Sequence, residues 1–312
     1  MNPRLAVALR IVVIGAVIAC LYWFVREIDW AQLGSALGGA KLWPIALAAV
    51  LNFACLWGKA ACWRVMLAPR YDVTTTRLFR YTIAAFAASV IAPARAGEVL
   101  RVWALKRRDA VPVADSAAVA VAEKVLDAVS MVLLVAPVPW LLPGLPTWVG
   151  TAILAVTVVA LALFVVVYLA AGRAKPGATS WFGRFLGGMH IVRSPRILAQ
   201  SLAALLGAWL ADIAMVLLVL YAVGIDQPVA AGIFILFAIN LTIALPSTPA
   251  GVGAFEVGAI AAMDILGVPR APALAFAIIY HVLQVLPLVV VGLAVEMRLV
   301  LGREPVPPEI AS

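Results

Sequence analysis

Three charged residues lie close together in a long apolar stretch of the chain, AVAVAEKVLDAVSMVLLV at residues 118–135. Glu123 and Asp127 are four residues apart, so on a helix they share one face, and Lys124 lies beside Glu123. Charged side chains inside an apolar helix that crosses a membrane are costly and usually face a polar interior. These residues therefore predict a polar site that balances cations, binds a charged group or carries protons. The alternatives are an ion-pair network that only holds helices together or, for Glu123, a position at the membrane interface.

Two further candidate sites lie where apolar sequence is interrupted by proline and glycine. The first interruption is PARAGE at residues 93–98, and the second is TPAGVGAFE at residues 248–256. Each places a proline and an Ala-Gly pair before a glutamate that opens a new helix, with Thr248 as the expected N-cap of the second helix. A helix N-terminus presents free N–H groups and a partial positive charge, which suits an anionic group. The alternative is that Glu98 and Glu256 themselves satisfy these helix ends.

A third polar group, Tyr280, His281 and Gln284, lies on one side of the last apolar segment. A lone histidine in such a position is more often a hydrogen-bonded packing residue than a ligand or a proton relay. We include it among the candidate substrate-binding residues, which are Arg95, Gly97, Glu98, Arg101, Glu123, Lys124, Asp127, Thr248, Gly251, Gly253, Glu256 and His281.

The composition identifies the elements that must position these residues as membrane-spanning helices. The chain has 312 residues, a mean hydropathy of +1.10 and only 12% charged residues, against about a quarter in soluble domains. Its net charge of +8 is explained by basic residues that flank apolar spans, so it does not indicate nucleic-acid binding. The sequence contains no GxxxxGK[ST], HExxH or CxxC motif, so neither a metal nor a cofactor is expected.

The placement of charge predicts how the chain crosses the membrane. If the interrupted regions 78–107 and 229–266 are re-entrant hairpins, every basic cluster falls on one side, with both termini in the cytoplasm. The fold class is then an all-α polytopic membrane protein, a single integral membrane domain over residues 1–312. Its halves, 1–142 and 147–298, form a weak inverted repeat, which is typical of secondary transporters. It has about six full transmembrane helices and two re-entrant helical hairpins, with the full spans at about 5–25, 42–66, 116–138, 148–171, 199–222 and 272–296.

With these motifs in view, the chain resembles the lysylphosphatidylglycerol synthase transmembrane, or flippase-like, family. The resemblance rests on PARAGEVLR at 93–101, AEKVLD at 122–127 and LPSTPAGVGAFE at 245–256, and it covers nearly the whole chain. It implies a protein of the bacterial cytoplasmic (inner) membrane. Relatives include the membrane domain of the multiple peptide resistance factor, which is thought to move aminoacylated phosphatidylglycerol between leaflets. The aminoacyltransferase domain of bifunctional members is expected to be absent, so this chain is not expected to synthesise that lipid.

The leading hypothesis is a lipid flippase or transporter that moves a polar, phosphate-bearing lipid between membrane leaflets. Arg95, Arg101 and the helix N-termini of the hairpins would hold the phosphate, and the acidic residues would balance those cations, bind a cationic headgroup or carry protons. The competing hypotheses are an integral-membrane transferase that modifies a lipid and a scaffold for a lipid-biosynthesis enzyme. The sequence offers no nucleophile–base pair, which favours transport over catalysis. The expected partners are a membrane lipid, a second copy of the chain and a lipid-biosynthesis enzyme.

Overall fold

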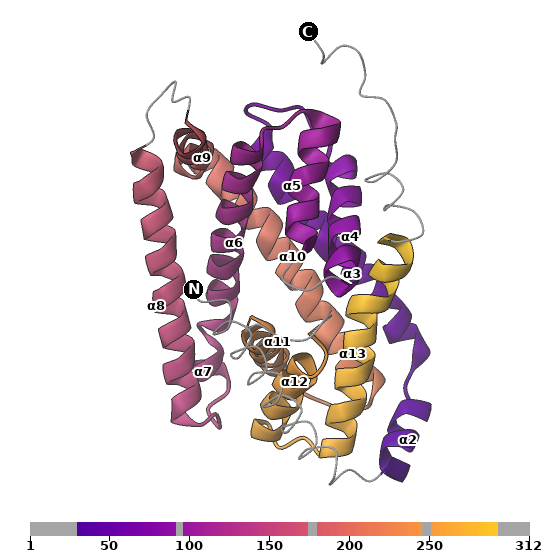
Figure 1. Ribbon diagram of the computed structural model, residues 1–312. Coiled ribbons are helices and arrows are strands. Elements are labelled where there is room, and N and C mark those ends of the chain that lie inside the picture. Colours follow the sequence, from indigo (N-terminus) through magenta and orange to yellow (C-terminus); the bar gives the residue numbers. More distant parts are fainter. Residues whose placement is uncertain (1–29, 92–95, 174–179, 245–250, 293–312) are drawn as a thin grey trace, which may run out of the picture.

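The computed structural model describes residues 30–91, 96–173, 180–244 and 251–292, and these residues form helices joined by short connections (Figure 1). Four described helices are long and apolar enough to cross a membrane: α3 (Leu42–Leu67), α8 (Thr147–Gly172), α10 (Pro195–Ala222) and α13 (Arg270–Val291). They confirm the helices expected at 42–66, 148–171, 199–222 and 272–296. The span expected at 5–25 lies outside the described residues.

Helix α6 (Val113–Val135) lies where the span 116–138 was expected but differs from those four helices in its charge. It is long enough to cross a membrane, at 1.5 Å per residue. However, it carries four charged side chains, Asp115, Glu123, Lys124 and Asp127. Since Asp115 and Glu123 are buried, this helix is stable in an apolar medium only if other helices supply partners for its charges.

The first interrupted region forms a pair of antiparallel helices, α4 (Thr75–Ile91) and α5 (Ala96–Asp109). Arg77 near the start of α4 forms an ion pair with Asp109 at the end of α5. At the opposite end of the pair, the Gly97 backbone N–H donates a hydrogen bond of 3.2 Å to the Ser89 hydroxyl. Helix α5 therefore begins one residue before Gly97, as the sequence predicts.

The second interrupted region also forms two packed helices, α11 (Val229–Ile243) and α12 (Ala254–Ile265). The prediction that the second of these begins at Thr248 and Pro249 is wrong, because α12 begins at Ala254. Gly251 and Gly253 have φ angles of +75° and +91°, which favour glycine and lie outside the range of a right-handed helix, so α12 starts only after them. Gly253 is instead the residue that precedes α12, and Glu256 lies in its first turn.

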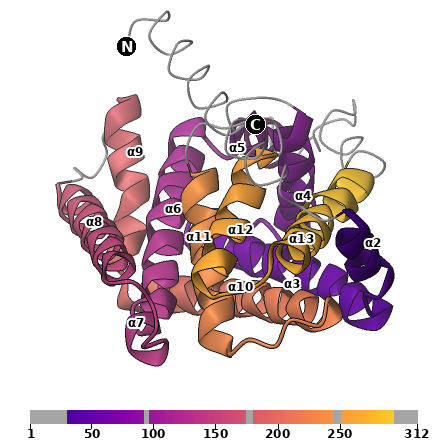
Figure 2. The same ribbon diagram turned by 90° about the horizontal axis from the view of Figure 1, so that it is seen from below.

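Helices α3 and α10 are the central pair of the packing, because they pack along each other and each contacts both α6 and α13, and Figure 2 shows them along the lower edge of the view. Glycine at position 58 allows this close approach, since a Cβ there would lie 2.9 Å from the Ala204 carbonyl oxygen and from the Ala208 Cβ. Figure 2 shows α11 and α12 between α6 and α13, while Figure 1 places the α4–α5 pair and the α11–α12 pair in opposite halves of the view.

Short helices complete the fold. Helix α2 (Trp30–Gly38) packs against α13, and α9 (Trp181–Met189) packs against α6 and continues into the 3-10 turn η1 (His190–Arg193). The one-turn helix α7 (Val138–Leu141) joins α6 to the connection that leads into α8.

The connection between α3 and α4 is tied to the start of α6 and to α9. Arg70 donates to Asp115 at 3.0 Å and to the Gly187 carbonyl oxygen at 2.9 Å, and the Tyr71 hydroxyl donates to Asp115 at 2.7 Å. Burial, together with the hydrogen bond to Asp115, raises the pKa of Tyr71 to about 12. The phenol therefore stays protonated at neutral pH and keeps donating this bond.

Candidate functional site

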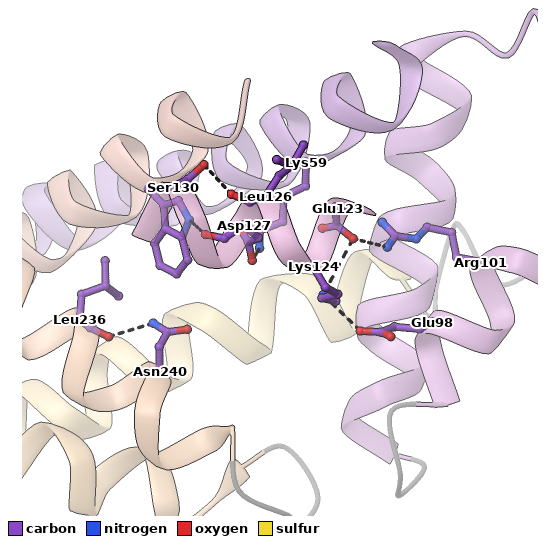
Figure 3. Close-up of polar contacts among 11 residues, drawn as sticks. Lys59, Glu98, Arg101, Glu123, Lys124, Leu126, Asp127, Ser130, Leu236 and Asn240 are labelled. Carbon is purple, nitrogen blue, oxygen red and sulfur yellow. Dashed lines mark hydrogen bonds and ion pairs between the residues drawn. The ribbon is translucent and has the colours of Figure 1, made fainter. Parts of the chain in front are cut away.

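Six charged side chains from α3, α5 and α6 form two neighbouring sets of ion pairs along α6, the chain of Glu98, Lys124, Glu123 and Arg101 and the pair of Lys59 and Asp127, which together we call the α6 cluster (Figure 3). Arg101 donates to Glu123 at 3.1 Å, and the Lys124 ammonium lies 3.9 Å from the same carboxylate. Lys124 also forms an ion pair of 3.2 Å with Glu98 in the first turn of α5. The structure thus confirms that Glu123 and Asp127 share a face of α6, and it brings Arg101 to Glu123 and Glu98 to Lys124.

One end of the α6 cluster is buried and the other end is accessible. The side chains of Arg101 and Glu123 are 6% and 1% exposed, whereas those of Lys124 and Glu98 are 43% and 38% exposed. The Arg101 guanidinium also lies 3.8 Å from the ring centre of Trp63, which adds a cation–π contact at the buried end. A ligand that approaches this cluster would therefore meet Glu98 and Lys124 first.

Lys59 is a member of the α6 cluster that the sequence reasoning missed. Its ammonium lies 3.3 Å from Asp127, and the side chains of both residues are mostly buried. The signal that could have found it is a lysine in the middle of the apolar span 42–66, since such residues are rare and functional by default. With Lys59 included, the cluster contains three cations and three carboxylates, so its formal charge is balanced.

A second polar group lies against α13, which we call the α13 cluster: Asp212, Glu256, Tyr280, His281 and Gln284. Asp212 of α10 accepts hydrogen bonds from the Tyr280 hydroxyl at 2.6 Å and from the Gln284 amide at 2.9 Å. His281 turns to α12 instead, where its Nδ1 lies 2.5 Å from Glu256. Asp212 was missed by the sequence reasoning, although it is an acid in the middle of the apolar span 199–222.

The two clusters meet on the central helices. On α10, Trp209 donates to the Asp127 carbonyl oxygen at 3.3 Å, one turn before Asp212 contacts α13. On α3, the Asn52 amide donates to the Leu283 carbonyl oxygen at 2.7 Å, whereas Lys59 contacts α6. Both central helices therefore bridge α6 and α13.

The members of the two clusters occupy matching positions in their helices. Lys59 lies seventeen residues after Leu42 at the start of α3, and Asp212 lies seventeen residues after Pro195 at the start of α10. Glu98 and Glu256 each lie two residues after the first residue of α5 and α12.

The correspondence extends to α6 and α13. Lys124 lies eleven residues after Val113, and His281 lies eleven residues after Arg270. Asp127 and Gln284 each lie fourteen residues after the same helix starts. The contact of Glu98 with Lys124 thus has a counterpart in that of Glu256 with His281, and the contact of Lys59 with Asp127 has one in that of Asp212 with Gln284.

Of the other predicted site residues, Gly253 joins the α13 cluster through its backbone N–H, which donates to Glu256 at 2.6 Å, and the rest either make no contact with the clusters or cannot be placed. Gly97 lies at the start of α5 beside Ser89, and Gly251 and Gly253 form the turn before α12. Arg95 and Thr248 lie outside the described residues. Within the described residues, His, Cys, Asp and Glu nowhere form a group of three or more that could hold a metal ion.

Asp212→Leu is expected to lower the stability of the protein. The change leaves the buried Tyr280 hydroxyl without an acceptor, at a cost of about 1–3 kcal/mol, while the half-buried Gln284 amide keeps only its hydrogen bond to Tyr280. Asp212→Asn keeps an acceptor oxygen in place and should cost less. Thermal unfolding of the purified variants in detergent micelles measures the difference, and equal midpoints for Leu and wild type would contradict the expectation.

The family described as Lysylphosphatidylglycerol synthase TM region matches residues 7–292. The match spans all of the described helices and therefore both clusters. A search of curated proteins finds no match.

Proposed function

Because this chain belongs to the lysylphosphatidylglycerol synthase TM region family, a family of lipid-related membrane domains, we propose that it moves a polar, phosphate-bearing lipid between the two leaflets of its membrane. The observation that carries the proposal is the pair of polar clusters at matching positions beside α6 and α13. A transporter of this kind needs a headgroup site near mid-membrane that both leaflets can reach in turn.

The matching positions support an arrangement of two inverted half-repeats. The starts of α5 and α12 contact the middles of α6 and α13, through Glu98 with Lys124 and Glu256 with His281. The packing of helices agrees, since α9 lies on α6 and α2 lies on α13, and α3 packs along α10. An inverted repeat places equivalent groups on paths from opposite faces of the membrane, which is what alternating access uses.

The α6 cluster supports a phosphate-bearing headgroup as the cargo. Lys124 and the start of α5 form its accessible end, where an ammonium and the partial positive charge of a helix N-terminus can receive an anion. Deeper in the cluster, the Arg101 Nε and one oxygen of Asp127 are buried without a hydrogen-bond partner among the described residues. Buried polar atoms of this kind require a partner, and a headgroup or its water would supply one.

We also propose an orientation of the chain in the membrane. Both termini lie in the cytoplasm of a bacterial cell, and α4–α5 and α11–α12 are re-entrant hairpins. Exposed Trp43, Trp140 and Trp148 support it, because they lie at the helix ends opposite to the basic ones, as interfacial aromatics do. The basic residues Lys106, Arg107 and Arg108 end α5, and the next cytoplasmic group includes Arg184 and Arg193.

Cysteine labelling is expected to confirm this orientation. In a background with Cys20, Cys55 and Cys62 replaced by alanine, an impermeant thiol reagent added outside the cell should label Leu142→Cys and Asp226→Cys. It should not label Arg107→Cys or Arg184→Cys until the membrane is opened, although Arg107, Arg184 and Asp226 are all exposed. Strong labelling of Arg107→Cys from outside would make α4–α5 a full crossing and remove the inverted repeat.

A vesicle assay tests the function itself. Purified protein is incorporated into vesicles that contain a phospholipid with a fluorescent headgroup, and an impermeant quencher then reports how much of it lies in the outer leaflet. Faster exchange between leaflets than in protein-free vesicles, with the lipid mass unchanged, is the expected result. A new lipid mass with unchanged leaflet distribution would point to a transferase, and no change in either would favour a scaffold.

A further inference from the structure

The two hairpin contacts at matching positions differ in one chemical respect. In the α6 cluster, Glu98 contacts a lysine, Lys124. In the α13 cluster, Glu256 contacts a histidine, the side chain that changes charge between about pH 5 and 8. Among the described residues, therefore, only the contact of α12 with α13 can gain or lose its cation through a proton.

The geometry of the histidine contact requires one proton and allows a second. His281 Nδ1 lies 2.5 Å from a Glu256 oxygen, so a proton must lie between the two atoms, since their lone pairs would otherwise repel. The other Glu256 oxygen accepts the Gly253 backbone N–H at 2.6 Å, which fixes the carboxylate at the start of α12. The imidazole stacks on Phe255, with ring centres 4.3 Å apart and planes 13° apart.

Protonation of the imidazole therefore changes the net charge of the pair from minus one to zero. The His281 and Glu256 side chains are only 9% and 15% exposed, so a net charge at this position is costly and a neutral pair is favoured. Loss of the proton leaves a single negative charge between α12 and α13, which favours entry of water and separation of the two helices.

In the part of the chain that the structure describes, the helices packed around His281 place no second basic side chain in contact with Glu256. Helix α12 contributes Glu256, and α10 contributes Asp212, one turn away through Tyr280 and Gln284. Helix α2 has no titratable residue in WAQLGSALG, and α3 faces this part of α13 with Asn52, while its Lys59 is paired with Asp127.

Among the described helices that pack on α13, the last to consider is α4, which meets α13 at its C-terminal end. Its titratable residues are Arg77, Arg80 and Tyr81, whereas the contact with α13 is made where Ala87 and Ile83 lie against Gly292. Among the described residues, the imidazole proton is therefore the group that balances the charge of Glu256.

We propose that His281 and Glu256 form a proton-binding site, whose occupancy holds α12 on α13 and whose deprotonation releases it. The inference rests on the proposed function in one respect, that the release of α12 is a step of lipid movement. Lipid movement then depends on the proton concentration on the side of the membrane from which His281 and Glu256 are reached. The contact of Glu98 with Lys124 in the α6 cluster takes no part in this dependence.

The test exchanges the two bases. In vesicles at equal internal and external pH, the rate of lipid exchange of the wild type should change at least about fivefold between pH 5.5 and pH 8, because imidazole titrates in this range. His281→Lys and His281→Gln should each flatten this profile, and the matched variant Lys124→His should add a second pH-dependent step. A His281→Gln variant that keeps the wild-type profile, or a flat wild-type profile, would overturn the proposal.

A second readout does not depend on transport. The sequence has two histidines, so His190→Gln leaves His281 as the sole imidazole, whose titration can be followed by nitrogen-15 NMR in lipid nanodiscs. Hydrogen exchange of the α12 amides, corrected for the intrinsic effect of pH, should rise as His281 loses its proton and should stay constant in His281→Lys. If α12 responds in this way while no lipid moves at any pH, the proton site stands and the transport function fails. If lipid moves but the hydrogen exchange of α12 does not change as His281 titrates, the transport function stands and the proton site fails.

Discussion

Glu123→Leu is expected to abolish lipid movement and to destabilise the protein more than Arg101→Met does. Removal of Glu123 leaves the Arg101 guanidinium, 6% exposed, without a carboxylate partner among the described residues. Breaking a buried ion pair in this way costs about 3–5 kcal/mol. Removal of Arg101 costs less, because the Lys124 ammonium remains 3.9 Å from the Glu123 carboxylate.

A double replacement separates the structural role of this pair from its role in binding. Arg101→Met with Glu123→Leu removes both charges and keeps the volume, so most of the lost unfolding free energy should return. If the pair takes part in holding a headgroup, lipid exchange in vesicles should stay at the level of protein-free vesicles. Recovery of both stability and exchange in the double variant would reduce the pair to a structural ion pair.

Gly97→Leu is expected to separate α5 from α4 and to stop lipid movement. A Cβ at this position would lie 1.9 Å from the Ala85 carbonyl oxygen and 2.2 Å from the Ser89 hydroxyl, and the first of these atoms belongs to the backbone of α4. Overpacking typically costs about 1–3 kcal/mol, and here no flexible neighbour can absorb the clash. The displaced helix start would also carry Glu98 away from Lys124.

A matched glycine provides the control for this change. Gly207 also lies in a helix, but a Cβ there meets no atom within 4 Å. Gly207→Leu should therefore leave the thermal unfolding midpoint and the rate of lipid exchange close to those of the wild type. Equal losses for the two variants would mean that bulk in a helix, rather than the contact of α4 with α5, causes the effect.

Much of the helical layout could be predicted from hydropathy and charge alone. Long apolar runs predict α3, α8, α10 and α13, because the length needed to cross a membrane leaves little choice of boundary. The spacing of Glu123 and Asp127 places them on one face of α6, because helical periodicity is local. The glutamates at the starts of α5 and α12 follow from the same local rules.

The partners of these charges could not be predicted, because they depend on which helices pack together. Lys59 and Asp127 are 68 residues apart, and Asp212 and Tyr280 are also 68 residues apart, so no local pattern connects them. The start of α12 was misplaced for a different reason. Two glycines with positive φ angles hold a turn there, and a nearby Thr-Pro looks like a better start by residue preference.

The position of the charges on α6 has a consequence for how the protein is made. Each charged residue at the centre of a helix adds about 2.5–3.5 kcal/mol to the cost of inserting that helix alone. The partners Lys59 and Arg101 precede α6 in the chain, so they are already in the membrane when α6 leaves the ribosome. Asp212 is in the opposite situation, because Tyr280 and Gln284 are synthesised later. During biosynthesis there should therefore be a stage at which α10 is in the membrane while Asp212 still lacks its partners on α13. A chain truncated before α13 imitates this stage, and we expect quality-control proteases to degrade it.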